Sequence, residues 1–339
     1  MDERVKKLIN MPQLQQRSPE WYAARPNFIT ASSAANLLIR DKKTCGTYVR
    51  TYGLEDIFDF DKKCCNPYST KVQYYLDKCV GSKFKGNIAT YHGQKYEQVA
   101  SDIYSNTVNE DVLEFGLIIH EKYPWLAASP DGITPSGIML EIKCPYRRKI
   151  NGITPLVYWI QTQLQMEVCD LERCDFAEFE FIEFSSKEEW NDNILDIDFL
   201  HKGMLIQIEK ITDSDIPNPE DNEYIYPPRN LIDNDNAIEE WVETEINKLN
   251  ISIKDQFVDK RKFSRIYWKV KTQYIKTIHR DREWFENTRP VFIKEWSKIE
   301  FYKKNDNYKK LLSNEPKIIG EKTIHLDIGD KECILSDSD

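Results

Sequence analysis

The chain has 339 residues and a formal net charge of −9, and 40% of its residues are hydrophobic. Eight Trp, 18 Tyr and 15 Phe exclude a disordered chain, and the absence of any apolar run of 18 residues excludes a membrane-spanning one. The length allows one large domain or a core with an extension. The charged first ten residues hold no apolar signal segment, so we expect an intracellular protein with reduced cysteines.

The N-terminal region predicts two short helices. Ser18 can cap the first, which Pro19 can begin, and this helix ends before Pro26, because proline disfavours helical geometry in the residue before it. Thr30 or Ser32 can cap the second, which is rich in alanine.

Residues 40–86 have no clear period and mix turn residues, charges and four cysteines, which indicates an insertion with short helices. The cysteine spacing C-x18-CC-x13-C contains no C-x2-C pair, so we interpret these as reduced thiols and not as a zinc site. A long helix follows, over about residues 91–107.

The next region predicts an α/β core with a central mixed sheet over about residues 112–184. Turns containing glycine and proline separate its first strands, and the 91–107 and 155–168 helices flank the sheet. The expected strands are 112–120, 125–128, 137–143 and 174–184.

The remaining chain reads as mostly helical, with a helical segment over 187–211. Residues 212–236 are rich in Pro, Asn and Asp and indicate a boundary. We therefore predict a core over residues 1–215 and a mostly helical C-terminal extension over 216–339.

Charge is unevenly distributed along the second half. Residues 254–310 contain 17 Lys and Arg against 8 Asp and Glu, whereas residues 175–223 contain 3 against 15. A predicted basic helix over 260–282 interleaves aromatic residues with Lys269 and Lys271, and we hypothesise that it contacts the DNA backbone. The alternative is a helix packed on the core by its aromatic face.

Asp131, Glu141 and Lys143 form the pattern with the most chemistry. Asp131 lies in a turn after one strand, and Glu141 lies on the next strand, so a short hairpin can bring both carboxylates to one Mg²⁺ ion. Glu141 and Lys143 are two residues apart and share one face of the strand. Ile142 points into the core, while its carbonyl stays free as a further ligand. Lys143 can then hold or deprotonate an attacking water.

Other residues fit such a site. Glu97 lies on the preceding helix, and Gln161 on the following one, where an amide can orient water or phosphate. Arg25 offers a fork for phosphate, and Ser32 a hydroxyl at a helix N-terminus. Taken singly, each has a plainer interpretation as a solvent-facing Glu, a polar helix face, a surface Arg or a capping Ser.

The Asp131, Glu141 and Lys143 pattern resembles the PD-(D/E)XK nuclease motif. In their order along residues 18–185, the segments resemble the lambda-exonuclease family of phage and viral recombination nucleases. The segments are W-x3-R-x3-ITAS at 21–32, G-x2-YE at 93–97, SPDG at 129–132, LEIKCP at 140–145 and Y-x2-Q-x-Q at 158–163.

The resemblance implies roles for these residues. Asp131, Glu141 and the Ile142 carbonyl would bind Mg²⁺, for which Mn²⁺ would substitute, and Lys143 would handle the nucleophilic water. Glu97 and Gln161 would support the site, with Glu97 as a possible further metal ligand. Arg25 and Ser32 would bind the 5′-phosphate of the strand end.

The implied activity is 5′→3′ digestion of linear double-stranded DNA for viral recombination, repair or replication, in the host cytoplasm or nucleus. A single-strand annealing protein is an expected partner, and ring-shaped oligomers occur in the family. Two alternatives stay open. One is an endonuclease or a DNA/RNA nuclease with the same catalytic site. The other is an inactive DNA-binding scaffold that keeps only the fold.

Overall fold

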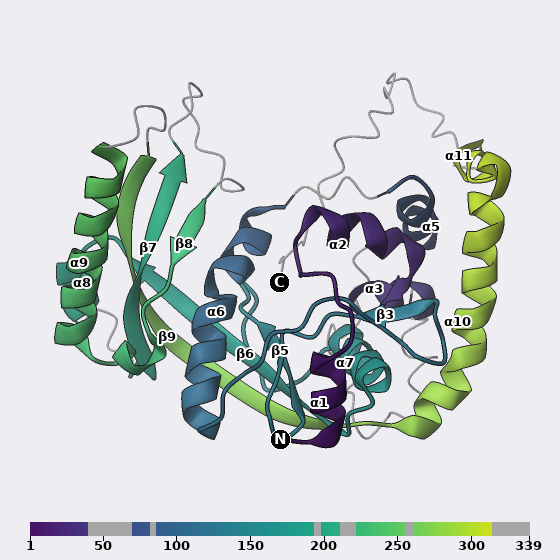
Figure 1. Cartoon of the computed structure of the whole chain (residues 1–339), viewed down its shortest axis with the longest axis horizontal. Coiled ribbons are helices and arrows are strands. Elements are labelled where there is room, and N and C mark those ends of the chain that lie inside the picture. The colour runs from purple at the N-terminus through teal and green to yellow at the C-terminus, as the bar shows by residue number, and fades with distance from the viewer. Residues whose placement is uncertain (40–69, 82–85, 193–197, 211–221, 255–260, 314–339) are drawn as a thin grey trace.

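The computed structural model describes residues 1–39, 70–81, 86–192, 198–210, 222–254 and 261–313 (Figure 1). Most of the expected 40–86 insertion, with Cys45, Cys64 and Cys65, lies outside this part. The described end of that insertion is a helix, α5 (Lys71–Val80), on which Cys79 is half-buried. No described helix is long and apolar enough to cross a membrane.

The main sheet of the described residues has six strands in the order β4-β5-β6-β9-β7-β8. Only β5 and β6 are parallel, and α7 connects them as the crossover that parallel strands require. This mixed sheet confirms the predicted α/β fold. The strands are β4 (Gly132–Ile133), β5 (Ile138–Lys143), β6 (Arg173–Phe184), β7 (His201–Lys210), β8 (Glu223–Ile225) and β9 (Arg261–His279).

A second, three-stranded sheet lies beside the first and joins the N-terminal segment to the core. It contains β1 (Ile29–Thr30), β2 (Ile118–Ile119) and β3 (Leu126–Ala128), with β3 in the middle. The helices before and after β1 are α1 (Glu3–Ile9), α2 (Pro19–Ala24) and α3 (Ala31–Leu38), and the 3-10 helix η1 (Arg25–Asn27) follows α2 directly. Ser18 caps α2 as expected, and Thr30 is the N-cap residue of α3.

Two helices cover opposite faces of β5 and β6. α6 (Ile88–Val108) packs Tyr96 and Ile103 against Leu140 and Ile142 of β5. α7 (Leu156–Cys169) is buried on nearly every side, among α3, β3 and β6. Because side chains alternate along a strand, β5 presents Leu140 and Ile142 to α6 and Glu141 to α7.

Two helical predictions are wrong. Where residues 187–211 are described, they form the short helix α8 (Lys187–Asn191) and then the strand β7 in place of one long helix. The expected basic helix over 260–282 is the 19-residue strand β9, which pairs with β6 on one side and β7 on the other. The predicted C-terminal extension therefore contributes two described strands, β8 and β9, to the main sheet. Its other described elements are helices.

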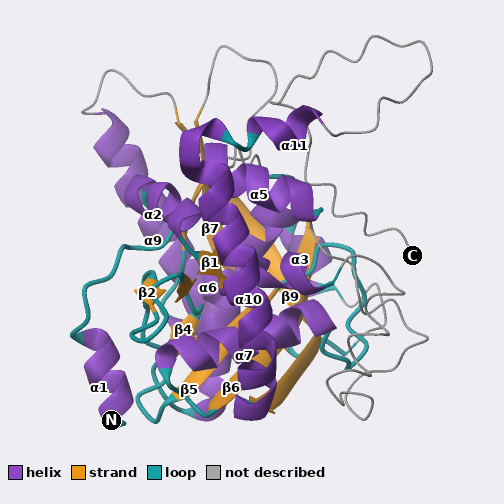
Figure 2. Ribbon diagram, turned by 90° about the vertical axis from the view of Figure 1, so that its right-hand side faces the viewer, coloured by secondary structure: helices purple, strands orange, loops and turns teal. Residues whose placement is uncertain are grey.

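Those helical segments flank the sheet at two ends. The 3-10 helix η3 (Arg229–Leu231) leads to α9 (Asp235–Lys254), which packs with α8 on β7 and β9 around Trp190, Ile238 and Val242. α10 (Arg282–Lys303), the 3-10 helix η4 (Lys304–Asp306) and α11 (Lys309–Ser313) lie at the other end. Figure 1 shows β9 running between these two ends beneath α6, and Figure 2 shows α10 and α7 in front of the strands.

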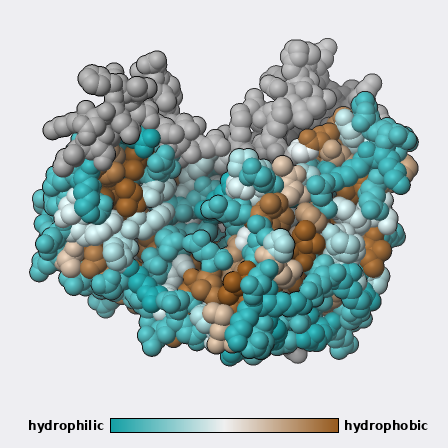
Figure 3. Space-filling model, in the orientation of Figure 1, coloured by the Kyte–Doolittle hydropathy of each residue, from teal (hydrophilic) through white to brown (hydrophobic). Residues whose placement is uncertain are grey.

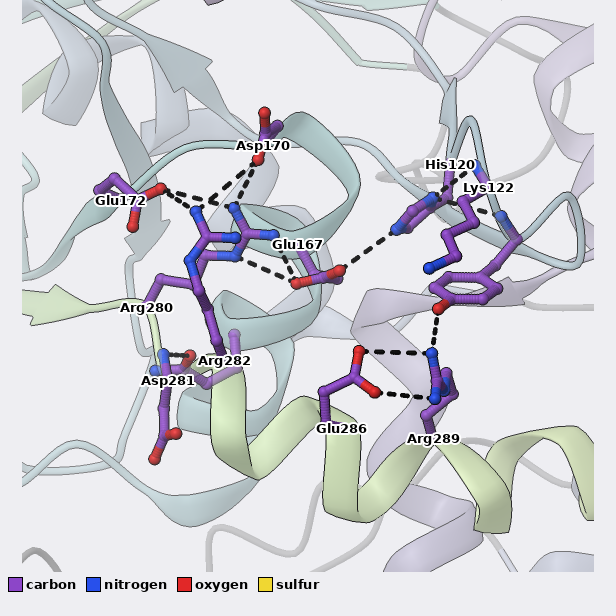
Figure 4. A network of polar contacts seen from close by, with 12 residues as sticks. His120, Lys122, Glu167, Asp170, Glu172, Arg280, Asp281, Arg282, Glu286 and Arg289 are labelled. Carbon is purple, nitrogen blue, oxygen red and sulfur yellow. Dashed lines mark hydrogen bonds and ion pairs between the residues drawn. The ribbon is translucent and has the colours of Figure 1, made fainter.

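An ion-pair network fixes the turn from β9 into α10 (Figure 4). Arg280 donates to Glu167 near the end of α7, at 2.6 Å, and to Asp170 at 2.7 Å. His120, in the turn between β2 and β3, lies 3.4 Å from the same Glu167 carboxylate. Arg282 and Glu172 extend the network at the surface. One partly buried carboxylate thus connects α7 to the β2–β3 turn and to the start of α10.

Candidate active site

Asp131 lies at the bend just before β4. Its Oδ2 accepts a hydrogen bond of 2.7 Å from the backbone N–H of Ile142, on the edge of β5 beyond the end of β4. The next residue must be glycine, because a Cβ at Gly132 would lie 2.1 Å from Val112 Cγ1. Part of the Asp131 side chain is exposed, yet the surrounding protein desolvates its carboxyl. That desolvation, with the charges of Glu141 and Glu97, raises the pKa of Asp131 well above its ordinary value.

Glu141 is fully buried, and α7 supplies its hydrogen-bond donors. Gln161 donates to Glu141 Oε1 and Gln165 to Oε2, each at 2.7 Å. Lys143 forms an ion pair with the same Oε1. These contacts compensate a carboxylate that would be costly to bury alone. Gln165 was missing from the predicted site, although the spacing 158, 161 and 165 already placed it on the face of Gln161.

Lys143 is held in its charged form. Burial acts to lower its pKa, but the carboxylates of Glu141 and Asp131 outweigh burial, so the pKa is raised. The ammonium also lies 4.8 Å from the ring centroid of Tyr158 on α7. Across the parallel pair, Lys143 is in register with Glu178 of β6, which is buried and forms an ion pair with Arg148. The cation therefore has a fixed position among carboxylates and an aromatic face.

Glu97 reaches this site from the other side of β5. It lies on α6 and contributes to the field at Asp131, but its own carboxylate forms an ion pair with Arg17. Among the described residues, no three His, Cys, Asp or Glu side chains form a metal cluster. Glu97 therefore contributes to the electrostatics at Asp131, and its role as a metal ligand stays a prediction.

The donor set nevertheless fits a divalent cation. Asp131 and Glu141 are desolvated oxygen donors that repel each other, and Mg²⁺ needs only one or two carboxylates when water and phosphate fill the other positions. The N–H and C=O of one strand residue point to the same side of the strand. Because the Ile142 N–H points to Asp131, its carbonyl points toward that side too, as a third oxygen donor.

The segment before β1 reaches this site. Trp21 donates from its indole nitrogen to Ser129 Oγ at 3.0 Å, and Gln16 donates to the Pro130 carbonyl at 2.8 Å. Both contacts brace the bend that holds Asp131. The W-x3-R part of the sequence pattern is therefore in contact with the SPDG part.

Arg25 and Ser32 lie together, as their predicted shared role requires. The Arg25 guanidinium donates to Ser32 Oγ at 3.2 Å and lies 4.1 Å from the Trp21 ring centroid. Ser32 is an exposed hydroxyl in the first turn of α3. Burial lowers the pKa of Arg25. The pair presents a cation and a hydroxyl at a helix N-terminus, where anions are favoured.

Two lysines beside Arg25 were not predicted. Lys78 of α5 is buried and donates to the Arg25 carbonyl at 3.0 Å, and Lys303 of α10 donates to the Pro26 carbonyl at 2.8 Å. Burial, and then the charges of Arg25 and Lys303, lower the pKa of Lys78 to about 7. Three cations thus meet near the start of α3, and an anion there would relieve their repulsion.

Lys269 and Lys271 of β9 are less accessible to a DNA backbone than the predicted basic helix implied. Lys269 is buried, with its ammonium 5.0 and 4.9 Å from the rings of Phe184 and Phe199. Lys271 forms an ion pair of 3.1 Å with Glu180. The geometry favours the packed alternative for Lys269, and DNA contact by these two lysines stays a prediction without support from their surroundings.

An α/β core with two carboxylates and a lysine at one strand end is the arrangement that the nuclease resemblance implies. A family model confirms the resemblance: residues 59–172 match the YqaJ-like viral recombinase domain. The matched range contains Glu97, Asp131, Glu141, Lys143 and Gln161. Residues 59–172 are thus similar in sequence to the YqaJ-like viral recombinase domain.

Other comparisons extend beyond that segment. The chain is 30% identical to an uncharacterized protein of Acanthamoeba polyphaga mimivirus over 93% of its own length, and it spans 58% of that relative's length. Its backbone is similar to that of an alkaline exonuclease from Laribacter hongkongensis. The two chains are 16% identical, and the match covers 86% of this chain and 98% of the exonuclease, with a TM-score of 0.42. A phage-related exonuclease of Haemophilus somnus 129PT matches at 15% identity, 84% and 95% coverage and a TM-score of 0.40. Scores this low do not bear on the chemistry.

Proposed function

We propose that the protein is a metal-dependent DNA exonuclease that digests linear double-stranded DNA from 5′ ends in viral recombination, repair or replication. The observation that carries the proposal is the buried Glu141, ordered by Gln161 and Gln165 and paired with Lys143 beside Asp131. A fully buried carboxylate with this many hydrogen-bond donors, next to a second carboxylate and a lysine, is typical of a catalytic site.

Asp131, Glu141 and the Ile142 carbonyl would hold Mg²⁺, with Mn²⁺ as a substitute. When bound, the ion would supply Lewis acidity at the phosphate and a lower pKa for a bound water. Lys143 donates hydrogen bonds to hold the attacking water and to offset negative charge at the phosphate. Gln161 and Gln165 hold the Glu141 carboxylate in one orientation.

End recognition is assigned to the second cluster. Arg25, Ser32, Lys78 and Lys303 would bind the terminal 5′-phosphate, because a guanidinium and a helix N-terminus both favour a phosphate dianion. The described surface is hollowed between the part with α9 and the part with α2 and α10 (Figure 3), which gives a duplex a place to approach both clusters.

The mode of cutting is tested on linear duplex DNA labelled at one end, with a 5′-phosphate or a 5′-hydroxyl, beside covalently closed circles. The proposal predicts that phosphorylated linear DNA is shortened from its 5′ ends in Mg²⁺ and that circles survive. Cutting of circles at the same rate would make the protein an endonuclease. Cutting of RNA as well would widen the substrate class. An absence of cutting in both Mg²⁺ and Mn²⁺ would favour the inactive scaffold.

A further inference from the structure

The loop that follows β5 carries an exposed aromatic ring close to the proposed catalytic lysine. Tyr146 is 42% exposed, whereas Met139, Leu140 and Ile142 of β5 before it are buried. It lies three residues after Lys143, so the two Cα atoms are at most about 10 Å apart at the rise of an extended chain. An exposed tyrosine this near the cleavage position is in reach of the strand that would be cut.

A column of packed rings supports Tyr146 from beneath. Its ring centroid lies 5.3 Å from that of His92, which in turn lies 4.9 Å from Tyr96. Tyr96 stacks on Phe181 of β6 at 4.1 Å, with only 12° between the ring planes. His92 and Tyr96 are buried on α6, so the column stands on the rigid core. Tyr146 therefore presents a ring whose orientation is fixed before any ligand arrives.

His92 is neutral at physiological pH. Burial and the neighbouring Lys95 lower its pKa to about 4, against a smaller opposing effect of Glu183. Its Nε2 is buried and has no hydrogen-bond partner among the described residues, and the same holds for the Tyr96 hydroxyl. The support beneath Tyr146 is thus an uncharged aromatic stack.

Cations next to Tyr146 are free of carboxylates. The guanidinium of Arg147 lies 5.2 Å from the Tyr146 ring centroid, and both Arg147 and Lys149 are exposed. In the part of the chain that the structure describes, no acidic side chain forms an ion pair with either residue, whereas Arg148 between them pairs with Glu178. Two of the three cations of this loop therefore remain available for phosphates.

We propose that Tyr146 is a stacking platform for an unpaired nucleobase of the strand being processed, with Arg147 and Lys149 on the adjacent phosphates. An aromatic face beside mobile cations is the combination by which proteins hold single-stranded nucleic acid. Inside a duplex both faces of each internal base are covered, so only a terminal, frayed or separated base can occupy the ring. This assignment rests on the proposed function for the identity of the strand.

The test uses 2-aminopurine, whose fluorescence falls when it stacks, placed at successive positions near the 5′ end of phosphorylated single-stranded and duplex oligonucleotides. Binding is measured in EDTA, so that no cleavage occurs. The variants are Tyr146→Phe, which keeps a ring, and Tyr146→Leu, which keeps apolar cover over His92 but cannot stack in the same way. Phe301→Leu is the matched control, because Phe301 is 50% exposed with Lys310 above its ring and lies outside the loop that follows β5.

The proposal predicts quenching at one position by the wild type, Tyr146→Phe and Phe301→Leu. Tyr146→Leu should lose the quenching and bind single strands roughly 5- to 150-fold more weakly, the range for one lost base–aromatic stack. Equal quenching and affinity in Tyr146→Leu, or no quenching by the wild type, would overturn it. A wild type that quenches but cuts no DNA in Mg²⁺ would support the platform while the proposed nuclease function fails.

Discussion

Gln161 and Gln165 supply hydrogen bonds that the buried Glu141 carboxylate needs. Each amide donates to a different oxygen of the carboxylate, so its orientation is fixed from α7. Gln163, on the same helix, instead donates to the His279 carbonyl and accepts from the Asp281 N–H. Three neighbouring glutamines therefore divide into two that serve the site and one that serves the fold.

This division gives a prediction with an internal control. Gln165→Leu should reduce Mg²⁺-dependent cleavage about 10- to 100-fold or shift its Mg²⁺ requirement upward by that factor, because outer residues that orient metal ligands have effects of this size. Gln163→Leu should lower thermal stability and leave the Mg²⁺ requirement unchanged. Initial rates across a Mg²⁺ titration measure both. Equal Mg²⁺ curves for Gln165→Leu and the wild type would remove Gln165 from the site.

We predict that Lys78 makes the proposed recognition of 5′-phosphate ends dependent on pH. The Lys78 ammonium has a pKa of about 7, so it is charged below that pH and neutral above it. Burial and the charges of Arg25 and Lys303 lower this pKa, and the charge of Asp77 raises it. Binding of phosphorylated ends should therefore weaken from pH 7 to 9, a range in which the phosphate itself stays a dianion. The ratio of affinities for phosphate and hydroxyl ends measures this effect. Lys78→Met should make that ratio low and flat, and an unchanged slope in this variant would assign the effect elsewhere.

At the scale of single residues, the sequence predicted contacts between site residues that are near one another in the chain. Asp131, Glu141 and Lys143 come from one hairpin, so their spacing alone indicated that they meet. Lys78 and Lys303 belong to helices far from Arg25 in sequence, and nothing in the local pattern connects them. Only the packing of α5 and α10 beside η1 brings these side chains together.

At the scale of elements, β9 shows how a helical pattern can arise by coincidence. Phe263, Ile266, Tyr267, Val270 and Tyr274 have the spacing of one helical face, yet they belong to a strand. β9 pairs on both edges and contributes residues to three hydrophobic clusters, so apolar residues are needed on both of its faces and the alternation is blurred. Its richness in Ile, Tyr, Trp, Val and Thr was the available signal for a strand.

The strand β7 was missed for a similar reason. Met204, Leu205 and Ile206 are buried in succession, because both faces of β7 are covered. One face packs on α9, and the other contributes Leu205 to the hydrophobic cluster on the opposite face of the sheet. A short apolar run with no period does not distinguish a buried strand from a helix. The strands of the core, 125–128, 137–143 and 174–184, were predicted correctly, since turns marked their ends.

The junction of β9 and α10 predicts unequal effects for two adjacent arginines (Figure 4). The Arg280 side chain is 5% exposed and pairs with Glu167, whereas Arg282 is 59% exposed. Arg280→Leu should lower the free energy of unfolding by about 3 kcal/mol, because Glu167, whose side chain is only 12% exposed, would lose its main partner. Arg282→Leu should change it by less than about 0.5 kcal/mol. Urea unfolding monitored by tryptophan fluorescence compares them, and equal losses would contradict a buried role for Arg280.

At the scale of the whole molecule, the two halves of the chain share one sheet. β9 connects the part with α8 and α9 to the part with α7 and α10, and α10 brings Lys303 to the N-terminal segment. The predicted domain boundary at residue 215 stays a prediction. Residues after it nevertheless contribute strands to the main sheet and Lys303 to the cluster around Arg25. The site and its substrate cluster therefore depend on the whole described chain.

The central claim is that Asp131, Glu141 and Lys143 cut phosphodiester bonds with a bound divalent cation. The most direct test is single-turnover digestion of a phosphorylated linear duplex in Mg²⁺ by the wild type and by Glu141→Gln, Lys143→Met and the surface control Arg282→Leu. The account predicts that the wild type and Arg282→Leu cut the DNA at similar rates, that EDTA abolishes cutting, and that the other two variants fold but cut at least 100-fold more slowly. Unchanged cutting by Glu141→Gln and Lys143→Met would place the chemistry elsewhere and contradict the account.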